Sequence, residues 1–316
     1  MPSTPEATFV RADGRPLRVV PGFRDRVLGY RASVSPRPEW TPEEYARAAD
    51  KKLDRARRLV AEVERRSGGL DRSAVLDVGC GDGINCLVMA YLTRNRVVGA
   101  DLRLPLFDAA EGDGGGGGPR RLAELILARL DIGSFDDALE QLPVRFTRAD
   151  ATTLPFPADS FDVLLSRSAL EHIVPVERAL VEMARVVRPG GVIHHAVDPF
   201  YWLRGCHKRG VVDIPWAHAR LSLDDFARFV TEREGVEVAA KRCGRLRTLN
   251  RLTLAQWRAA IEAGPFHILE WTEEPSPFAA QLLAEHPDVL DSLTPGVEPR
   301  DLVNGRLEFW LRVRKS

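Results

Sequence analysis

The chain has 316 residues, of which 44% are hydrophobic and 28% charged, which is the composition of an ordinary globular protein. Its 45 basic and 45 acidic residues balance, and this argues against a nucleic-acid partner. No stretch approaches the roughly 18 apolar residues that span a bilayer, and the N-terminus lacks the apolar segment of a signal peptide. The four cysteines form no CxxC pair, so we expect a reduced, cytoplasmic protein with no membrane partner.

Residues 1–69 are expected to form an N-terminal arm followed by a helix. Residues 1–40 are rich in Pro and Arg and show little periodicity, which predicts an irregular arm over the rest of the fold. Thr41 and Glu44 have the spacing of a capping box, and Pro42 stands at the first helical position. Apolar residues then recur at helical spacing until two glycines follow Ser67, which predicts one long helix.

A strand, a glycine-rich turn and a helix come next. Residues 74–78 form a short apolar run of the kind found in a parallel strand buried on both faces. Gly79, Gly81 and Gly83 allow the backbone to turn sharply and to approach a ligand closely. Residues 84–92 continue as an apolar helix whose N-terminus offers unpaired N–H groups. This arrangement is typical of a cofactor site.

Strands alternate with helices over the rest of the core, which predicts a doubly wound parallel α/β sheet. We interpret residues 104–141, with the glycine tract at 111–118, as an insertion after the second strand. The last strand alternates with period two, which indicates an antiparallel edge strand or an edge hairpin. The predicted strands after the first cover residues 97–101, 144–150, 160–166, 192–197, 266–271 and 307–313, and the predicted helices cover residues 120–130, 175–188 and 254–263.

The pattern divides the chain after the arm into three parts. Residues 70–198 form the predicted cofactor-binding core. Residues 199–265 break the strand–helix rhythm and are rich in aromatic and basic side chains, so we interpret them as a lid inserted after the fifth strand. Residues 266–316 would supply the last strands of the sheet.

The glycine turn alone does not identify the cofactor. Dinucleotide-binding folds use the spacing GxGxxG, but the position of their third glycine is Ile84 here, which argues against a nicotinamide cofactor. Asp101 follows Gly79 by 22 residues, where a carboxylate can accept hydrogen bonds from ribose hydroxyls in either kind of site.

Several motifs together resemble the class I S-adenosylmethionine-dependent methyltransferases, most closely the type 11 methyltransferase-domain family. The motifs are Val75-Leu-Asp-Val-Gly-Cys-Gly-Asp-Gly83, Gly99-Ala-Asp101, Arg148-Ala-Asp150 with Leu154-Pro-Phe156, Ser160-Phe-Asp162-Val, and Arg188-Pro-Gly-Gly191. The resemblance implies a Rossmann-like, mostly parallel sheet of seven strands in the order 3-2-1-4-5-7-6, with the last strand antiparallel.

The resemblance also implies which residues bind S-adenosyl-L-methionine. Asp101 would hold the ribose hydroxyls, Asp150 the adenine amino group and Leu102 the adenine face, while Ser166 would face the sulfonium. The implied cofactor-binding residues are Asp77, Gly79, Cys80, Gly81, Asp101, Leu102, Asp150, Ala151 and Ser166.

Candidate catalytic residues follow the fourth and fifth strands. His195 and Asp198 are predicted to act together as the catalytic base. His172 is a further candidate that could equally be structural. His194 and His195 must point to opposite faces of the sheet, so at most one of them faces a given pocket. The spacing of His195, Asp198 and His207 matches no standard metal pattern, so we expect no metal site.

These features predict an enzyme that methylates a small, apolar or aromatic acceptor, such as a secondary metabolite. Oxygen is the favoured acceptor atom. Nitrogen or carbon methylation and a non-catalytic S-adenosylmethionine-binding regulatory or assembly protein are the alternatives. Methyltransferases that act on amino groups of DNA or RNA often carry (D/N)PPY after the fourth strand, where this chain reads Ser166-Arg-Ser-Ala. The sequence leaves open whether the protein forms a homodimer.

Overall fold

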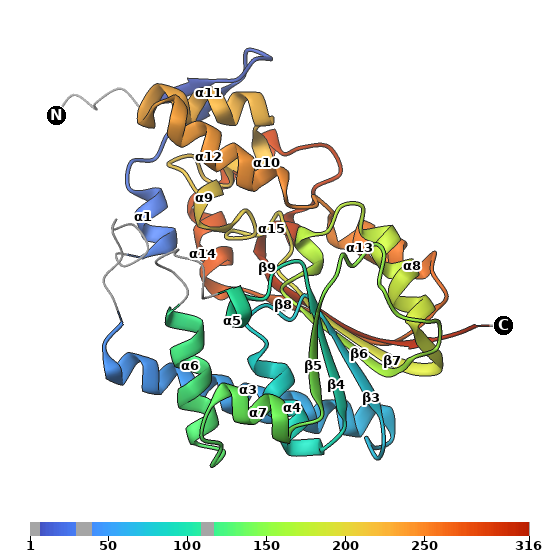
Figure 1. Ribbon diagram of the computed structural model, residues 1–316. Coiled ribbons are helices and arrows are strands. Elements are labelled where there is room, and N and C mark those ends of the chain that lie inside the picture. Colours follow the sequence, from blue (N-terminus) through green and yellow to red (C-terminus); the bar gives the residue numbers. More distant parts are fainter. Residues whose placement is uncertain (1–6, 30–39, 109–116, 316) are drawn as a thin grey trace.

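The computed structural model describes residues 7–29, 40–108 and 117–315, so most of the glycine tract and part of the arm lie outside the described residues. Its main sheet has, within these residues, seven strands in the order β5-β4-β3-β6-β7-β9-β8 (Figure 1). The strands are β3 (Ala74–Val78), β4 (Arg96–Asp101), β5 (Val144–Arg148), β6 (Phe161–Arg167), β7 (Val187–Val197), β8 (Phe266–Pro275) and β9 (Asn304–Val313). Numbered along the chain within this sheet, the order is 3-2-1-4-5-7-6.

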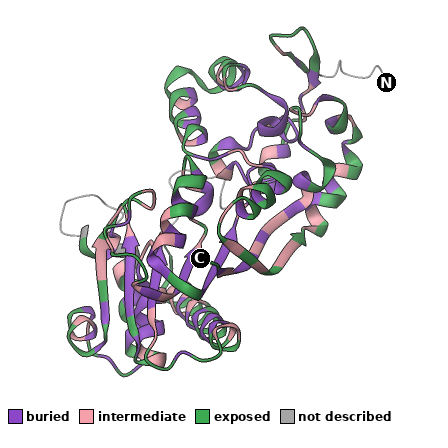
Figure 2. Ribbon diagram, turned by 90° about the vertical axis from the view of Figure 1, so that its right-hand side faces the viewer, coloured by how far each residue is buried: buried purple, intermediate pink, exposed green. Residues whose placement is uncertain are grey.

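The directions of the strands also confirm the predicted sheet. β3 pairs in parallel with β4 and β6, while β9 pairs antiparallel with both β7 and β8. Figure 2 shows that the central strands are the buried ones, as their near-continuous apolar sequences require. No helix among the described residues is long and apolar enough to cross a membrane.

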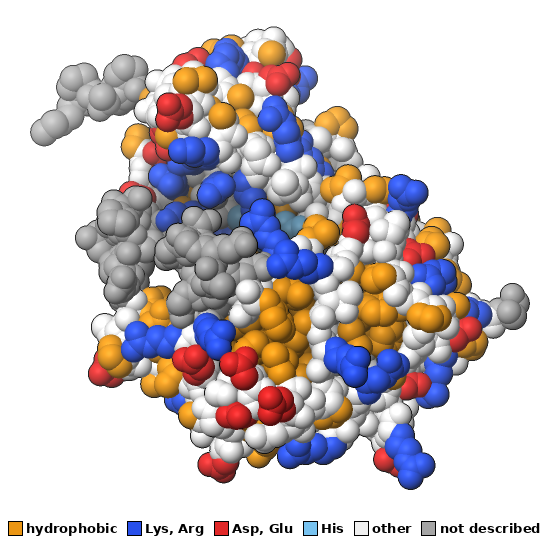
Figure 3. Space-filling view, viewed as in Figure 1, with side chains coloured by type: hydrophobic (Ala, Val, Ile, Leu, Met, Phe, Trp, Pro, Cys, Tyr) orange, Lys and Arg blue, Asp and Glu red, His pale blue; other side chains and the backbone are white. Residues whose placement is uncertain are grey.

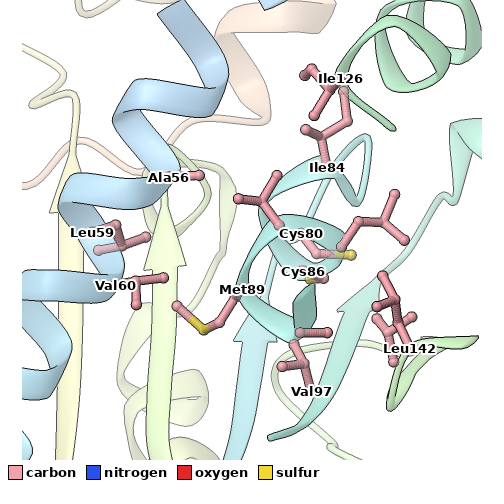
Figure 4. Close-up of a cluster of buried hydrophobic side chains, with 14 of the residues drawn as sticks. Ala56, Leu59, Val60, Cys80, Ile84, Cys86, Met89, Val97, Ile126 and Leu142 are labelled. Atoms are coloured by element: carbon pink, nitrogen blue, oxygen red, sulfur yellow. The ribbon is translucent and has the colours of Figure 1, made fainter. Parts of the chain in front are cut away.

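Helices cover both faces of the sheet. One face packs against α3 (Pro42–Ser67), α4 (Ile84–Thr93), α6 (Gly117–Ala128) and α7 (Phe135–Gln141). Figure 4 shows this core, in which Val60 of α3 approaches Met89 of α4. The other face packs against α8 (Val176–Val186) and α13 (Leu254–Glu262), where Trp257 is fully buried. The core domain therefore has three layers.

The capping box predicted at the start of α3 is confirmed. The Thr41 hydroxyl accepts the N–H of Glu44, and the Glu44 carboxylate accepts the N–H of Thr41. Thr253 and Gln256 form the same capping box at α13. Gly68 ends α3 in the left-handed conformation, as a glycine at this position permits.

A second hydrophobic cluster lies beside the sheet and is built from three separate parts of the chain, which we call the cap: residues 8–28, 200–249 and 277–303. Figure 1 places the cap above the carboxyl ends of the parallel strands. Its elements are β1 (Thr8–Val10), β2 (Pro16–Arg18), α1 (Phe23–Leu28), α9 (His207–Gly210), α10 (Ala217–Arg220), α11 (Leu223–Glu234), α12 (Val236–Arg247), α14 (Pro277–Glu285), η2 (Pro287–Ser292) and α15 (Pro299–Val303).

The cap differs from expectation at both ends of the chain. Residues 8–28 are not irregular: β1 and β2 pair antiparallel, and Phe9 and Leu17 are buried in the cap. Each strand has three residues and buries one side chain, which is too short a run to show periodicity in the sequence. Residues 277–303, expected to add only strands to the sheet, contribute helices to the cap.

Candidate functional site

A cavity of about 350 Å³ opens at the carboxyl ends of β3, β4 and β6. In a doubly wound sheet this edge is the usual place for a ligand. Figure 3 shows, in the middle of the face seen there, an apolar depression with Lys, Arg and His side chains above it. The cavity is lined by Val78, Gly79, Gly81, Ala100, Asp101, Leu102, Ala149, Asp150, Ala151, Thr152, Ser168, Ala169, His172, Ile173 and Val174.

The glycine turn forms one wall of this cavity, and its glycines serve different purposes. Gly79 has φ 75°, and a Cβ there would lie 2.2 Å from the Cβ of Ala169, so packing requires glycine. Gly81 has φ 56°, and a Cβ there would meet no atom of the described residues within 4 Å. Because Gly81 lines the cavity, such a Cβ would take up space that a ligand can otherwise use.

Two carboxylates in the cavity wall are held by backbone hydrogen bonds. Asp101 accepts the N–H of Gly81 on Oδ2 at 2.8 Å and the N–H of Arg103 on Oδ1 at 3.1 Å. Asp150 accepts both the N–H and the hydroxyl of Thr152 on Oδ1, each at 2.8 Å. These bonds to Thr152, the backbone one first, lower the pKa of Asp150. The two side chains are therefore oriented before any ligand binds.

Most of the predicted cofactor-binding residues line the cavity: Gly79, Gly81, Asp101, Leu102, Asp150 and Ala151. Asp77 and Cys80 are buried nearby without lining it. The Cys86 thiol donates to Asp77 Oδ2 at 3.5 Å, and burial raises the pKa of Asp77 to about 6. Asp77 therefore lies behind the glycine turn, on the side away from the cavity.

The prediction for Ser166 is wrong about its position. Its side chain is buried, its hydroxyl has no hydrogen-bond partner among the described residues, and it does not line the cavity. β6 continues to Arg167, one residue past the predicted end of the strand, so the lining falls to Ser168 and Ala169.

His172 is the predicted catalytic residue that does line the cavity. It belongs to a single turn, η1 (Leu170–His172), and its ring stacks on that of His207 from the cap with centroids 5.0 Å apart. Burial, then the charges of Arg245 and His207, lower the pKa of His172 to about 4. The imidazole is therefore neutral at neutral pH.

His195 does not lie at the cavity, and it forms no hydrogen bond with Asp198, its predicted partner in the catalytic base. Both ring nitrogens of His195 lack a hydrogen-bond partner among the described residues, and the ring packs 5.0 Å from Phe309. Burial lowers the pKa of His195 to about 3. His194 faces the opposite side, as predicted, with Nε2 2.8 Å from Oε1 of Glu308. His195 fails as a base because it lies in the body of β7, before the strand end.

Beside His172 lies a group that the sequence did not single out, the carboxyl of Glu171. Glu171 is 1% exposed, and burial raises its pKa to about 8, against a weaker opposing effect of backbone N–H groups. The charge of Asp198 contributes to the shift, and burial also raises the pKa of Asp198. No group of three or more His, Cys, Asp or Glu side chains in the described part of the chain could hold a metal ion.

The model of the family described as methyltransferase domain matches residues 76–194, the stretch that supplies the cavity wall. These residues form a class I methyltransferase domain. The methyltransferase domain thus runs from β3 into β7 and excludes the cap.

Relatives align with part of this chain. An uncharacterized methyltransferase of Mycobacterium tuberculosis is 33% identical over 124 residues, 39% of this chain and 50% of the relative. A ubiquinone/menaquinone biosynthesis C-methyltransferase of Rickettsia massiliae is 31% identical over 119 residues, 38% of this chain and 42% of the relative. The chain thus spans half or less of the length of these relatives. The crystal structure of the [4+2]-cyclase SpnF covers 90% of this chain and 86% of its own, at 20% identity and a TM-score of 0.45.

The different roles of Gly79 and Gly81 can be tested with a matched pair of alanine variants. Gly79→Ala is expected to lower the free energy of unfolding by about 2 kcal/mol more than Gly81→Ala, because only the first adds an overlap to the strained backbone. Gly81→Ala is expected to weaken the binding of S-adenosylhomocysteine instead, since its methyl group enters the cavity. Urea unfolding and calorimetry measure the two effects. Equal stability of the two variants would contradict the packing role of Gly79.

Proposed function

We propose that this protein transfers a methyl group from S-adenosyl-L-methionine to an oxygen atom of a small acceptor molecule. The observation that supports this most is the cavity in which Gly81 leaves space between two oriented carboxylates, Asp101 and Asp150. A nucleoside presents hydroxyl and amino donors at its two ends, and carboxylates are strong acceptors for both.

The residues present fit this cofactor. Asp101 would accept from the ribose hydroxyls and Asp150 from the adenine amino group, while Leu102 and Val174 offer apolar surface. Their side chains are 68% and 62% exposed, so a bound ring would cover apolar area now open to water. S-adenosylmethionine supplies, when bound, a methyl group on a positively charged sulfur, which is already a good leaving group.

The chain's own contribution would be to orient the acceptor and exclude water. The cap lies over the carboxyl edge of the sheet and brings aromatic side chains there, including Phe200 and Tyr201. His172 lines the cavity and is neutral at neutral pH, so its Nε2 could accept a hydrogen bond from an acceptor hydroxyl in place of the long one from Arg245. We infer that the acceptor lies in the cavity beside His172 and under the cap.

Methylation of carbon is the second candidate. It is favoured by the similarity to a ubiquinone/menaquinone biosynthesis C-methyltransferase, which aligns with 38% of this chain. An electron-rich aromatic ring with a hydroxyl group could accept a methyl group at either atom.

The experiment begins with calorimetric titration of the full chain with S-adenosylhomocysteine, where we expect saturable binding at one site. Turnover is then measured with a panel of phenols, hydroxy acids and quinols, with release of S-adenosylhomocysteine as the signal. Mass spectrometry with NMR of the product tells an O-methyl from a C-methyl group. Absence of binding would refute the proposal, and binding without turnover of any acceptor would favour a non-catalytic protein.

A further inference from the structure

Two arginines flank the point where the cap contacts the cavity wall through Asn250: Arg245 lies in the last turn of α12, and Arg251 follows in the connection to α13. Arg245 places Nη2 3.4 Å from Nε2 of His172, which lines the cavity. Arg245 is half-buried and forms no ion pair with any residue that the structure describes. An arginine with a neutral imidazole as its hydrogen-bond partner keeps its full positive charge available to a ligand.

Arg251 is similar. Its guanidinium lies 5.3 Å from the centroid of the Phe200 ring, and within the described ranges it too has no carboxylate partner. Burial lowers the pKa of Arg251, so part of its solvation has been lost without an ion pair to replace it. A bound anion would restore that stabilisation.

The segment that carries both arginines is fixed to the wall of the cavity. Asn250 is 8% exposed, and its N–H donates to the carbonyl of Glu171 at 2.9 Å. Its side-chain amide donates to the carbonyls of Leu170 at 2.7 Å and Ile173 at 3.3 Å. Arg245 is therefore held beside His172 by an ordered segment, which reduces the entropy that a ligand must remove on binding.

The carboxyl groups nearby do not neutralise these cations. Glu171 has a pKa of about 8 and carries little charge at pH 7. Burial raises the pKa of Asp198, and the charges of Arg306 and Arg167 act on this carboxyl in the opposite direction. Arg245 thus places a positive charge beside His172, and the neighbouring cavity lining includes the apolar residues Ile173 and Val174. Figure 3 shows the same contrast, with basic side chains above an apolar depression.

We propose that Arg245 and Arg251 form an anion-binding subsite, and that the acceptor is an apolar or aromatic molecule that carries a negatively charged group, such as a carboxylate, beside His172. This inference rests on the proposed function, because it takes the cavity to be the place where the acceptor meets the methyl donor. Arg245 acts here as a specificity-determining residue, and Arg251, the residue that follows Asn250, adds a second positive charge beside Phe200.

The test compares two probes that differ in charge alone at one position, 4-hydroxybenzoate and 4-hydroxybenzamide. Each is titrated calorimetrically into the full chain saturated with S-adenosylhomocysteine at pH 7.5. We expect the benzoate to bind at least tenfold more tightly than the amide. Arg245→Met should remove most of this preference, Arg245→Lys should retain part of it, and Arg251→Met should reduce it.

Arg247→Met is the matched control, since Arg247 is an exposed arginine at the end of the same helix and does not contact His172. It should keep the full preference, and all four variants should bind S-adenosylhomocysteine with wild-type affinity. Equal affinity for the two probes, binding of neither, or the same loss in Arg247→Met would overturn the subsite. If S-adenosylhomocysteine itself does not bind, the proposed function fails separately, and the same titrations on the free protein still test the subsite.

Discussion

Replacement of Asp101 by Ala is expected to weaken the binding of S-adenosylhomocysteine by about 100-fold. A ribose offers two hydroxyl donors to this carboxylate, and a hydrogen bond to a charged group contributes at least about 1.5 kcal/mol. Two such bonds amount to about 3 kcal/mol, and each 1.4 kcal/mol is a factor of ten in the dissociation constant. Calorimetric titration of wild type and variant measures the difference.

Asp82→Ala is the matched control for this experiment. Asp82 stands in the same glycine turn, but its carboxylate pairs with Lys52 and does not line the cavity. Asp101→Asn separates two roles of Asp101, because the amide oxygen can still accept the N–H of Gly81 while the charge is lost. We expect about a tenfold weaker affinity for it. A change below threefold in Asp101→Ala would contradict the assignment of Asp101 to the ribose.

Replacement of Glu171 by Gln is expected to stabilise the protein increasingly as the pH rises from 5 to 8. The pKa of Glu171 is about 8 in the folded protein against an ordinary 4.5. The unfolded chain therefore releases this proton at lower pH, and the free energy of unfolding of the wild type falls as the pH rises between these values. One pKa unit corresponds to about 1.4 kcal/mol, so the difference between variant and wild type approaches about 5 kcal/mol at pH 8.

Urea unfolding of both proteins at half-unit intervals from pH 5 to pH 8.5 measures this effect. Glu177→Gln serves as control, because Glu177 is exposed in the first turn of α8. The free energy of unfolding of this variant should differ from that of the wild type by a nearly constant amount across the pH range. A constant difference for Glu171→Gln as well would show that Glu171 ionises normally in the folded protein.

Much of the sheet could be predicted from local patterns. Buried parallel strands appear in the sequence as short apolar runs. The caps at Thr41 and Thr253 are predictable because a threonine hydroxyl can accept the backbone N–H three residues later. Asp101 and Asp150 could be placed together because parallel strands end at the same edge of a sheet. These features depend on a few adjacent residues and on the geometry of one sheet.

The errors lie where the position depends on contacts distant in sequence. Alternation along β7 shows that His194 and His195 face opposite sides, but not how far below the strand end the ring lies. Ser166 was misplaced by the single residue by which β6 extends. The contact of His172 with His207 and Arg245 joins segments 35 and 73 residues apart, and no local pattern encodes it.

The composition of the cap has a consequence for protein engineering. Its buried core interleaves residues 8–28, 200–249 and 277–303, whereas the methyltransferase domain occupies one continuous stretch. Exchange of acceptor preference between relatives by grafting residues 200–249 alone would leave Phe9, Leu17 and Leu302 facing a foreign surface. A chimera that retains its stability must therefore transfer all three segments together, or exchange the continuous stretch and leave the recipient's own cap in place.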